Sequence, residues 1–292
     1  MEFSIIITCD MDIINEKPLY QLLCSINNQV GFSQDNVEIK LLYNNSKAKF
    51  NFTNYPVFNK LVKLYCKKNS TIGNMKEEGY SNSLGKYILF LDKDIIFYHN
   101  TALSEIQSLL RSKKDYYVLN CVSGYALNGL DFRLENGIKI YNKEFLMSNN
   151  LHFPNVKSDE EVVFTQKIMN INAQWYKEEN AIYFIQLESK IPKTVNAIYN
   201  NIMANAYGFC EVAMINKNRL LNNLSWFIQS MYELENQFKL DEADKKAIEK
   251  SVKDILDIYK NIYTPVYGFA AARPQDPEFE NFCKRVMEEE NE

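Results

Sequence analysis

The chain has 292 residues, of which 24% are charged, with a formal net charge of −4 and a pI of about 5.5. This length suits one large α/β domain with a smaller appendage, and an acidic chain without a dense basic stretch disfavours general binding of nucleic acid. Six cysteines lie far apart without a C-x-x-C pair, and no segment resembles a signal peptide or a membrane span. The sequence predicts a reduced, cytoplasmic protein, with peripheral attachment to the inner face of the membrane as an alternative.

Strands and helices alternate along the first two thirds of the chain. β-branched residues in 3–8 predict a first strand, and apolar residues at helical spacing in 19–26 predict a helix after it. This alternation favours a parallel, layered α/β sheet. The other strands are expected at 37–43, 60–66, 87–91, 115–122 and 137–141, with further helices around 74–84 and from 158 onward.

Residues 87–98 read YILFLDKDIIFY, where Asp92 and Asp94 interrupt an otherwise apolar run. The apolar part is typical of a strand buried on both faces, so Asp92 marks the point at which the chain leaves the core. If the backbone stays extended, alternate side chains face opposite sides and the two carboxylates share a face. Ligands bind at the carboxyl ends of strands in open α/β sheets. The pair therefore predicts a divalent-cation site, and a strand followed by a plain polar turn is the alternative.

The last hundred residues have a different pattern. Beyond about Pro192 the sequence predicts helices only, among them an amphipathic helix that starts near Asp241. We expect a domain of residues 1–190 followed by a helical region of residues 191–292, which shapes a binding site or a homodimer contact. The apolar face of that helix consists of Ile248, Val252, Ile255, Tyr259 and Ile262.

Four segments in order resemble the family 2 nucleotide-sugar glycosyltransferases. They are FSIIITCD, VEIKLLYNNS, TIGNMKEEGYSNSLGKYILFLDKD and LHFPNVKSDEEVVFTQKIM, and together they cover about residues 3–186. The third matches the family closely, with Gly79 and Gly85 six residues apart ahead of an apolar strand that ends in D-x-D. The resemblance implies a GT-A fold, which is a Rossmann-like α/β architecture with a mainly parallel sheet and helices on both faces.

On the donor side, the resemblance implies roles for residues at the strand ends. Asp94, the last acid of D-x-D, would coordinate Mn²⁺ or Mg²⁺ at the donor diphosphate, and Asp92 would bind the ribose or the metal through water. Lys76 would neutralise phosphate, whereas a solvated helix-face lysine paired with a neighbouring glutamate is the alternative. The base and ribose would contact Thr8, Asp10 and Asn44. Plain turn chemistry is the alternative role for Asn44.

On the acceptor side, the resemblance places the general base in the cluster Asp159, Glu160 and Glu161. An inverting transfer needs such a carboxylate to take the proton from the acceptor hydroxyl. Glu161 corresponds to the base position, with Glu160 next. Ser158 and Glu161 also form a capping-box pattern, in which Glu161 would cap the helix and leave a neighbouring acid to act. Some family members add a late histidine to the metal, but no histidine follows His152 in this sequence.

These features predict a metal-dependent inverting glycosyltransferase, hexosyl or N-acetylhexosaminyl, that moves sugar from a UDP-sugar to a hydroxyl of a saccharide or glycoconjugate. Abundant Asn, Lys, Ile and Tyr suggest an AT-rich bacterial genome and a role in surface polysaccharide or glycan synthesis. Departures from the family pattern at Tyr43, Asn44 and Glu161 keep open a catalytically impaired nucleotide-sugar-binding module. A D-x-D phosphatase is disfavoured, because that class usually has small residues and threonine where this chain has Ile95 and Ile96.

Overall fold

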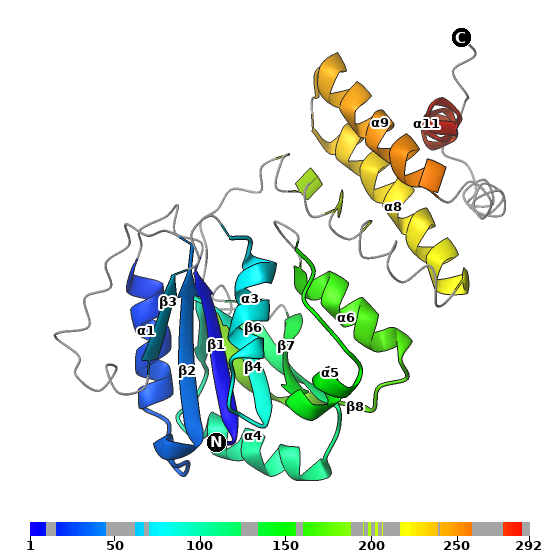
Figure 1. The fold of residues 1–292 in the computed structure, drawn as a ribbon. Helices are drawn as coiled ribbons and strands as arrows, with labels where there is room; N and C mark the ends of the chain where they lie inside the picture. Colours follow the sequence, from blue (N-terminus) through cyan, green and yellow to red (C-terminus); the bar gives the residue numbers. More distant parts are fainter. Residues whose placement is uncertain are drawn as a thin grey trace. The chain divides into compact units, whose positions relative to one another are not determined.

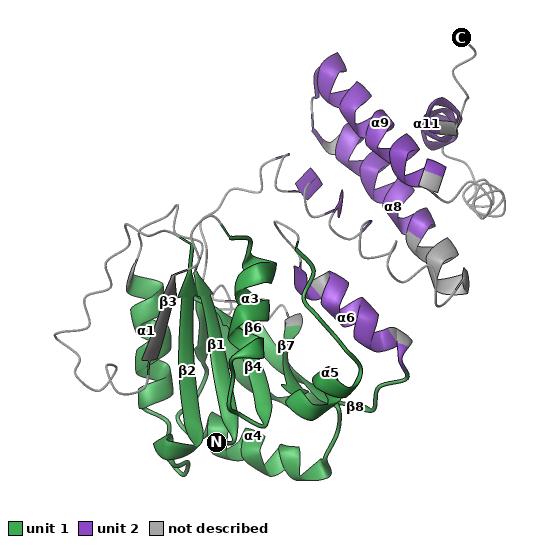
Figure 2. Cartoon of the chain, in the orientation of Figure 1, with its two compact units in different colours: residues 1–156, 172–191 green, residues 157–171, 192–292 purple. Residues whose placement is uncertain are grey.

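The chain forms two compact units, which Figure 2 shows in separate colours: residues 1–156 with 172–191, and residues 157–171 with 192–292. The boundary predicted after residue 190 stays a prediction, because residues 188–194 lie outside the described part of the chain. The computed structural model describes residues 1–9, 16–44, 62–66, 70–123, 134–155, 160–187, 217–238, 240–258 and 277–287, with single positions between 195 and 206.

One mixed sheet organises the first unit (Figure 1). Within the described residues it has eight strands in the order β3-β2-β1-β4-β7-β6-β8-β5. Hydrophobic runs supply the central strands, and all seven residues of β1 are buried. The strands are β1 (Phe3–Cys9), β2 (Val37–Tyr43), β3 (Val62–Cys66), β4 (Tyr87–Asp92), β5 (Ile95–Phe97), β6 (Tyr116–Ser123), β7 (Leu134–Asn142) and β8 (Trp175–Gln186).

The sheet combines a parallel half with a mixed half. β3, β2, β1 and β4 run parallel, whereas β7 is antiparallel to both β4 and β6. β8 then pairs parallel with β6, and β5 closes the edge antiparallel to β8. The predicted α/β class is confirmed, but β5 and β8 were not foreseen. β5 has only three residues, and exposed charged residues interrupt the pattern of β8 near its register shift against β6.

Helices cover both faces of the sheet. Leu19 and Leu22 of α1 and Leu103 of α4 share a buried core with Ile5 and Ile7 on one face of β1. α3 packs on the other face of the sheet, where its Gly79 lies against the side chain of Ile6 in β1. The helical elements of the first unit are α1 (Glu16–Asn27), η1 (Gln34–Asn36), α3 (Ile72–Ser81), α4 (Ala102–Leu109), η2 (Leu110–Ser112) and α5 (Lys143–Ser148).

Two glycines allow α3 and the loop after it to approach β1 closely. A Cβ atom on Gly79 would lie 2.6 Å from the Ile6 side chain. A Cβ atom on Gly85 would lie 2.3 Å from the backbone nitrogen of Ser4, which cannot yield as a flexible side chain can. The glycine spacing recognised in the sequence therefore has a packing cause, because both positions need a residue without a side chain.

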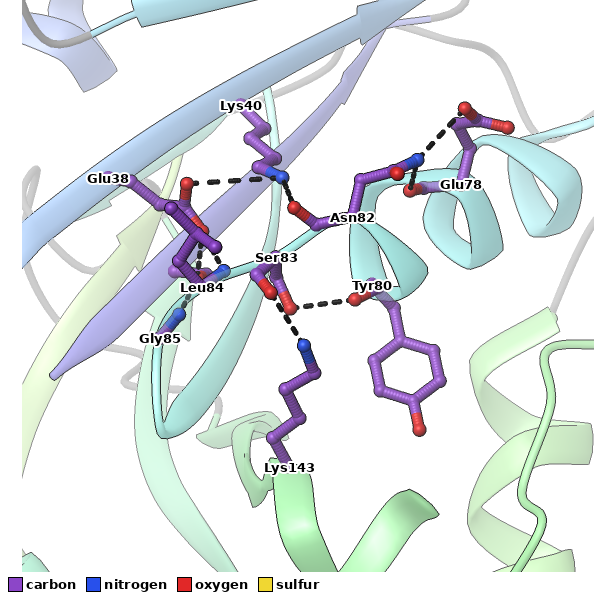
Figure 3. Close-up of polar contacts among 10 residues, drawn as sticks. Glu38, Lys40, Glu78, Tyr80, Asn82, Ser83, Leu84, Gly85 and Lys143 are labelled. Carbon is purple, nitrogen blue, oxygen red and sulfur yellow. Dashed lines mark hydrogen bonds and ion pairs between the residues drawn. The ribbon is translucent and has the colours of Figure 1, made fainter. Parts of the chain in front are cut away.

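A buried polar cluster fastens the end of α3 to β2 (Figure 3). Lys40 and Glu38 point to the same face of β2, with side chains only 2% and 3% exposed, and their Nζ and Oε2 atoms lie 3.9 Å apart. Lys40 Nζ also donates a hydrogen bond to the backbone carbonyl of Asn82, the C-cap residue of α3. A cation at that end of a helix complements the helix dipole.

The same cluster holds the loop that leads from α3 into β4. Glu38 Oε1 accepts hydrogen bonds from the Leu84 backbone N–H and the Ser4 hydroxyl, each 2.5 Å long. Lys143, at the start of α5, donates to the Ser83 carbonyl at 2.5 Å. Figure 3 shows these side chains converging on the loop from separate elements. The buried charges therefore have protein partners, as burial of ions requires.

The second unit is helical in its described part. Phe227, Val252 and Phe282 join α8, α9 and α11 in one apolar core, and Ile248 and Ile255 are buried in it as predicted. Tyr259 and Ile262 lie outside the described residues. Among the described helices, none is long and apolar enough to cross a membrane. The principal helices are α6 (Glu160–Asn170), α8 (Lys217–Gln237), α9 (Glu242–Ile258) and α11 (Pro277–Met287).

Candidate active site

Polar side chains gather where β1 and β4 end, side by side, at the carboxyl edge of the parallel half. Thr8 lies opposite Asp92 in the register of the two strands, and its hydroxyl is 3.5 Å from Asp92 Oδ1. The five residues before Asp92 are buried, whereas the Asp92 side chain is 53% exposed. The prediction that the chain leaves the core at Asp92 is confirmed. This carboxylate is therefore open to a ligand from solvent.

Lys76 brings a positive charge to the same place from α3. Its side chain is 1% exposed, and its Nζ atom lies 3.9 Å from Asp92 Oδ1 and 6.0 Å from the centre of the Phe90 ring. The alternative of a solvated lysine on the helix face is therefore wrong. The residue is buried because Gly79, one helical turn later, lets α3 settle closely on β1. A buried ammonium group beside an exposed carboxylate can attract an anion while the carboxylate holds a cation.

Asp94 lies in a turn and not in an extended strand. Residues 93 and 94 turn the chain from β4 into β5, and the Asp94 carbonyl accepts a hydrogen bond from the Leu187 backbone N–H at 2.7 Å. The expectation of an extended backbone from Asp92 to Asp94 is thus wrong, because β5 must reverse to pair with β8. Burial and the neighbouring Asp92 carboxylate raise the pKa of Asp94, while a hydrogen bond with Gln186 opposes the shift.

Cys9 is a neighbour of the two carboxylates that sequence reasoning did not assign to the site. Burial raises the pKa of the Cys9 thiol to about 12; Lys93 opposes this shift, and Asp92 and Asp94 add to it. The thiol therefore stays protonated near neutral pH and is a poor nucleophile. Cys9 itself is therefore poorly solvated, although the neighbouring Asp92 carboxylate is exposed.

The carboxylate oxygens at this edge suit a hard divalent cation whose other ligands come in part from a substrate. Among the described residues no group of three or more His, Cys, Asp or Glu side chains could bind a metal by itself. Mg²⁺ sites, however, often use one or two carboxylates together with substrate phosphates. The Asp92 carboxylate raises the cost of ionising Asp94, and a cation would relieve that repulsion. The residues present therefore fit Mn²⁺ or Mg²⁺ bound jointly with a diphosphate.

The other predicted residues have different placements. Asn44 follows β2, where its side-chain nitrogen lies 3.5 Å from the Ser70 carbonyl. Glu160 and Glu161 lie in the first turn of α6 in the second unit, and Glu160 is buried while Glu161 is half-buried. Asp10, Asp159 and Ser158, with the capping box, lie outside the described residues. The structure thus brings together Thr8, Lys76, Asp92 and Asp94.

Sequence reasoning did not foresee how the segment 150–155 attaches to α3. Glu77 accepts hydrogen bonds from the ring of His152 at 2.8 Å and from the backbone N–H of Phe153 at 3.0 Å. At the start of α3, the Thr71 hydroxyl donates to Asn155 Oδ1 at 2.8 Å. Glu77 precedes His152 by 75 positions, so no local pattern signals this contact.

The chain belongs to glycosyl transferase family 2, whose family model matches residues 4–177. This match includes β1 from Ser4 onward, α3, the carboxylates at the end of β4, and the later strands as far as the first residues of β8. No curated protein sequence matches the chain. Membership of this family identifies the protein as a nucleotide-sugar glycosyltransferase.

Solved structures similar to this chain are GT-A glycosyltransferases. TarS 1–349 from S. aureus in complex with UDP is 16% identical, with a TM-score of 0.71 over 98% of this chain and 88% of that chain. The mannosyltransferase PcManGT from Pyrobaculum calidifontis, in complex with GDP-Man and Mn²⁺, is 10% identical, with a TM-score of 0.53 over 97% and 79%. At these identities the similarity shows the GT-A fold.

Proposed function

We propose that the protein is a metal-dependent inverting glycosyltransferase that uses a UDP-sugar donor and a hydroxyl of a saccharide or glycoconjugate acceptor. The observation that carries this proposal is the meeting of Thr8, Lys76, Asp92 and Asp94 at the carboxyl edge of β1 and β4. UDP in the TarS structure and Mn²⁺ in the PcManGT structure agree with such a donor and metal. A role in bacterial surface glycan synthesis belongs to the same proposal.

The donor side of the proposal assigns each charge a task. Asp94 and Asp92 would hold Mn²⁺ or Mg²⁺, which when bound stabilises the negative charge that gathers on the departing diphosphate. Lys76 binds the diphosphate as a buried point charge, and its desolvated setting strengthens that attraction. Thr8, Asp10 and Asn44 contact the ribose and base. Asp92 contacts both Thr8 and Lys76, so it links the nucleoside part to the phosphate part.

The acceptor side needs a base, for which the proposal names Glu161, with Glu160 next and Asp159 third. The acceptor oxygen attacks the anomeric carbon as its proton passes to the carboxylate, and the bond to the diphosphate oxygen breaks. Both glutamates lie in the first turn of α6, the end of a helix at which the dipole interacts favourably with negative charge. Glu161 is half-buried while Glu160 is buried, so Glu161 is the more accessible acid.

The donor assignment is tested by thermal unfolding with a panel of nucleotide sugars, with and without Mn²⁺. A ligand of the native state raises the midpoint, by about 2.7 kcal/mol of stability at one hundred times its dissociation constant. We expect a UDP-sugar to act in this way only with the metal, and Asp94→Ala to lose the shift without loss of the fold. A variant with normal metal-dependent donor binding would refute the D-x-D assignment.

The base assignment is tested by Glu161→Gln and Glu160→Gln. Glutamine keeps the size and can still cap a helix, so the melting temperature should barely change. We expect transfer by the Glu161 variant to fall by about 10²–10⁴-fold, while donor affinity is retained. A loss in the Glu160 variant alone would move the role to Glu160. Two normal rates would exclude both glutamates, and donor binding without diphosphate release by the wild type would indicate the binding-module alternative.

A further inference from the structure

The segment 150–155 is attached to α3 at two positions. Near the start of the helix, Thr71 donates to Asn155 Oδ1 while its hydroxyl oxygen accepts the Asn74 backbone N–H at 3.2 Å. Nearer the end, Glu77 accepts hydrogen bonds from His152 and from the Phe153 backbone. These contacts join elements far apart in the sequence, within the first unit. The segment is therefore held along α3 by side-chain contacts at both ends.

Glu77 makes the central contact, because it uses both of its carboxylate oxygens. Oε1 lies 2.8 Å from His152 Nδ1, and Oε2 accepts the Phe153 N–H at 3.0 Å. The other nitrogen of His152 lies 3.0 Å from Asn150 Oδ1, which orients the ring. The Glu77 side chain is 25% exposed, so solvent only partly screens these interactions. Hydrogen bonds to an ionised acceptor are the stronger kind.

The attached segment packs on the same aromatic ring, Phe90, that the proposed phosphate-binding lysine approaches. Phe153 is buried and packs edge-to-face on Phe90, with ring centres 4.7 Å apart and planes at 68°. The Lys76 ammonium lies 6.0 Å from the centre of the same Phe90 ring. Lys76 and Glu77 are consecutive residues, so one turn of α3 contacts the site edge with Lys76 and holds the segment with Glu77. Further along the chain, the segment leads to Glu160 and Glu161.

We propose, on the basis of the proposed function, that Glu77 is a positioning residue for sugar transfer. It couples the turn of α3 that carries Lys76 to the segment 150–155, which precedes the acid cluster in the sequence, and the proposal gives it no contact with the nucleotide. Loss of the carboxylate should therefore impair turnover more than donor binding. This pattern separates Glu77 from Lys76, whose loss should impair donor binding itself.

The test compares Glu77→Ala with Glu78→Ala, which removes the next acid of the same helix. Glu78 is also half-buried, but its carboxylate accepts a hydrogen bond from Asn82 at the end of α3. Three quantities are measured for each full-length variant: amide hydrogen exchange in residues 150–155, affinity for UDP with Mn²⁺, and release of UDP from UDP-GlcNAc. Glu77→Gln is the rescue variant, because its amide oxygen can still accept the Phe153 N–H.

For Glu77→Ala we expect exchange in residues 150–155 to rise by about tenfold or more, as for loss of one charge-assisted hydrogen bond. UDP release should fall by about the same factor, while UDP affinity stays within about twofold of the wild type. Glu77→Gln should recover part of both losses, and Glu78→Ala should match the wild type.

Unchanged exchange in Glu77→Ala, or raised exchange with wild-type turnover, would overturn the role of Glu77 alone. A parallel loss of UDP affinity would show that Glu77 acts in donor binding, which also overturns it. A wild-type protein that neither binds UDP with Mn²⁺ nor releases it from any nucleotide sugar would overturn the proposed function and this role together.

Discussion

A buried lysine is paired with a carboxylate at each end of the central strands, but the carboxylate is buried at one end and exposed at the other. At the starting end, Lys40 and Glu38 are sealed among a helix C-cap, a loop and a neighbouring strand. At the carboxyl end, Lys76 is equally buried, but its partner Asp92 is half exposed. The same pairing of lysine with a carboxylate therefore serves the fold where the protein buries both side chains. Where one partner faces solvent, as Asp92 does, we propose that the pair binds a ligand.

The largest effect that we predict from this comparison is on stability, in Lys40→Met. Removing the lysine leaves the buried Glu38 carboxylate without its cation, which typically costs about 3–5 kcal/mol. The free energy of unfolding in urea measures the loss, and Lys250→Met, an exposed lysine on α9, should change it by less than about 0.5 kcal/mol. UDP affinity of the folded variant should remain normal. A Lys40→Met protein with unchanged stability and weakened UDP binding would contradict the assignment of a structural role to this end of the strands and a ligand-binding role to the other.

Lys76→Met makes the identical substitution at the other end. Methionine fills similar volume, and solvent can stabilise the exposed Asp92, so stability should change by less than in Lys40→Met. Affinity for UDP with Mn²⁺ should fall by about ten- to a hundredfold, as expected when one charged hydrogen bond to phosphate is lost. Titration calorimetry measures this difference. Equal UDP affinities in the variant and the wild type would mean that Lys76 only balances the charge of Asp92.

The smallest predicted effect is a pH dependence that only the carboxyl end should show. Burial and Asp92 raise the pKa of Asp94, so its protonated form persists to higher pH than in an ordinary aspartate. Metal binding needs the carboxylate, and Mn²⁺-dependent UDP affinity should fall by up to about tenfold per pH unit below that pKa.

The sign for stability is opposite to the sign for binding. Because the folded pKa of Asp94 lies above the unfolded one, the cost of its ionisation is present at neutral pH and disappears on acidification. UDP affinity that stays constant from neutral to mildly acidic pH would contradict a metal-binding role for Asp94.

Apolar runs explain how the sequence could predict β1 and β4, and the position of Asp92 at the end of β4. Long-range contacts explain the failures. The Glu38 and Lys40 positions in VEIKLLY are buried only because the loop from α3 covers them. Lys76 is next to Glu77 and Glu78 in the helix, which suggests a solvated face. Gly79 has no side chain, however, so the helix can pack closely against β1 and bury Lys76. The turn at Asp94 depends on β5 pairing with β8, almost a hundred residues later.

The pairing of β1 with β4 has a consequence for how the protein acquires its site. Thr8 and Asp92 are 84 positions apart, and the chain between them contributes two further strands that pair in parallel. Such non-local pairing costs loop-closure entropy before any contact forms, so it tends to form slowly. A ligand that bridges the two strand ends can bind only after they meet. A nucleotide sugar would therefore stabilise the fully paired sheet during refolding, relative to intermediates in which these strands are unpaired.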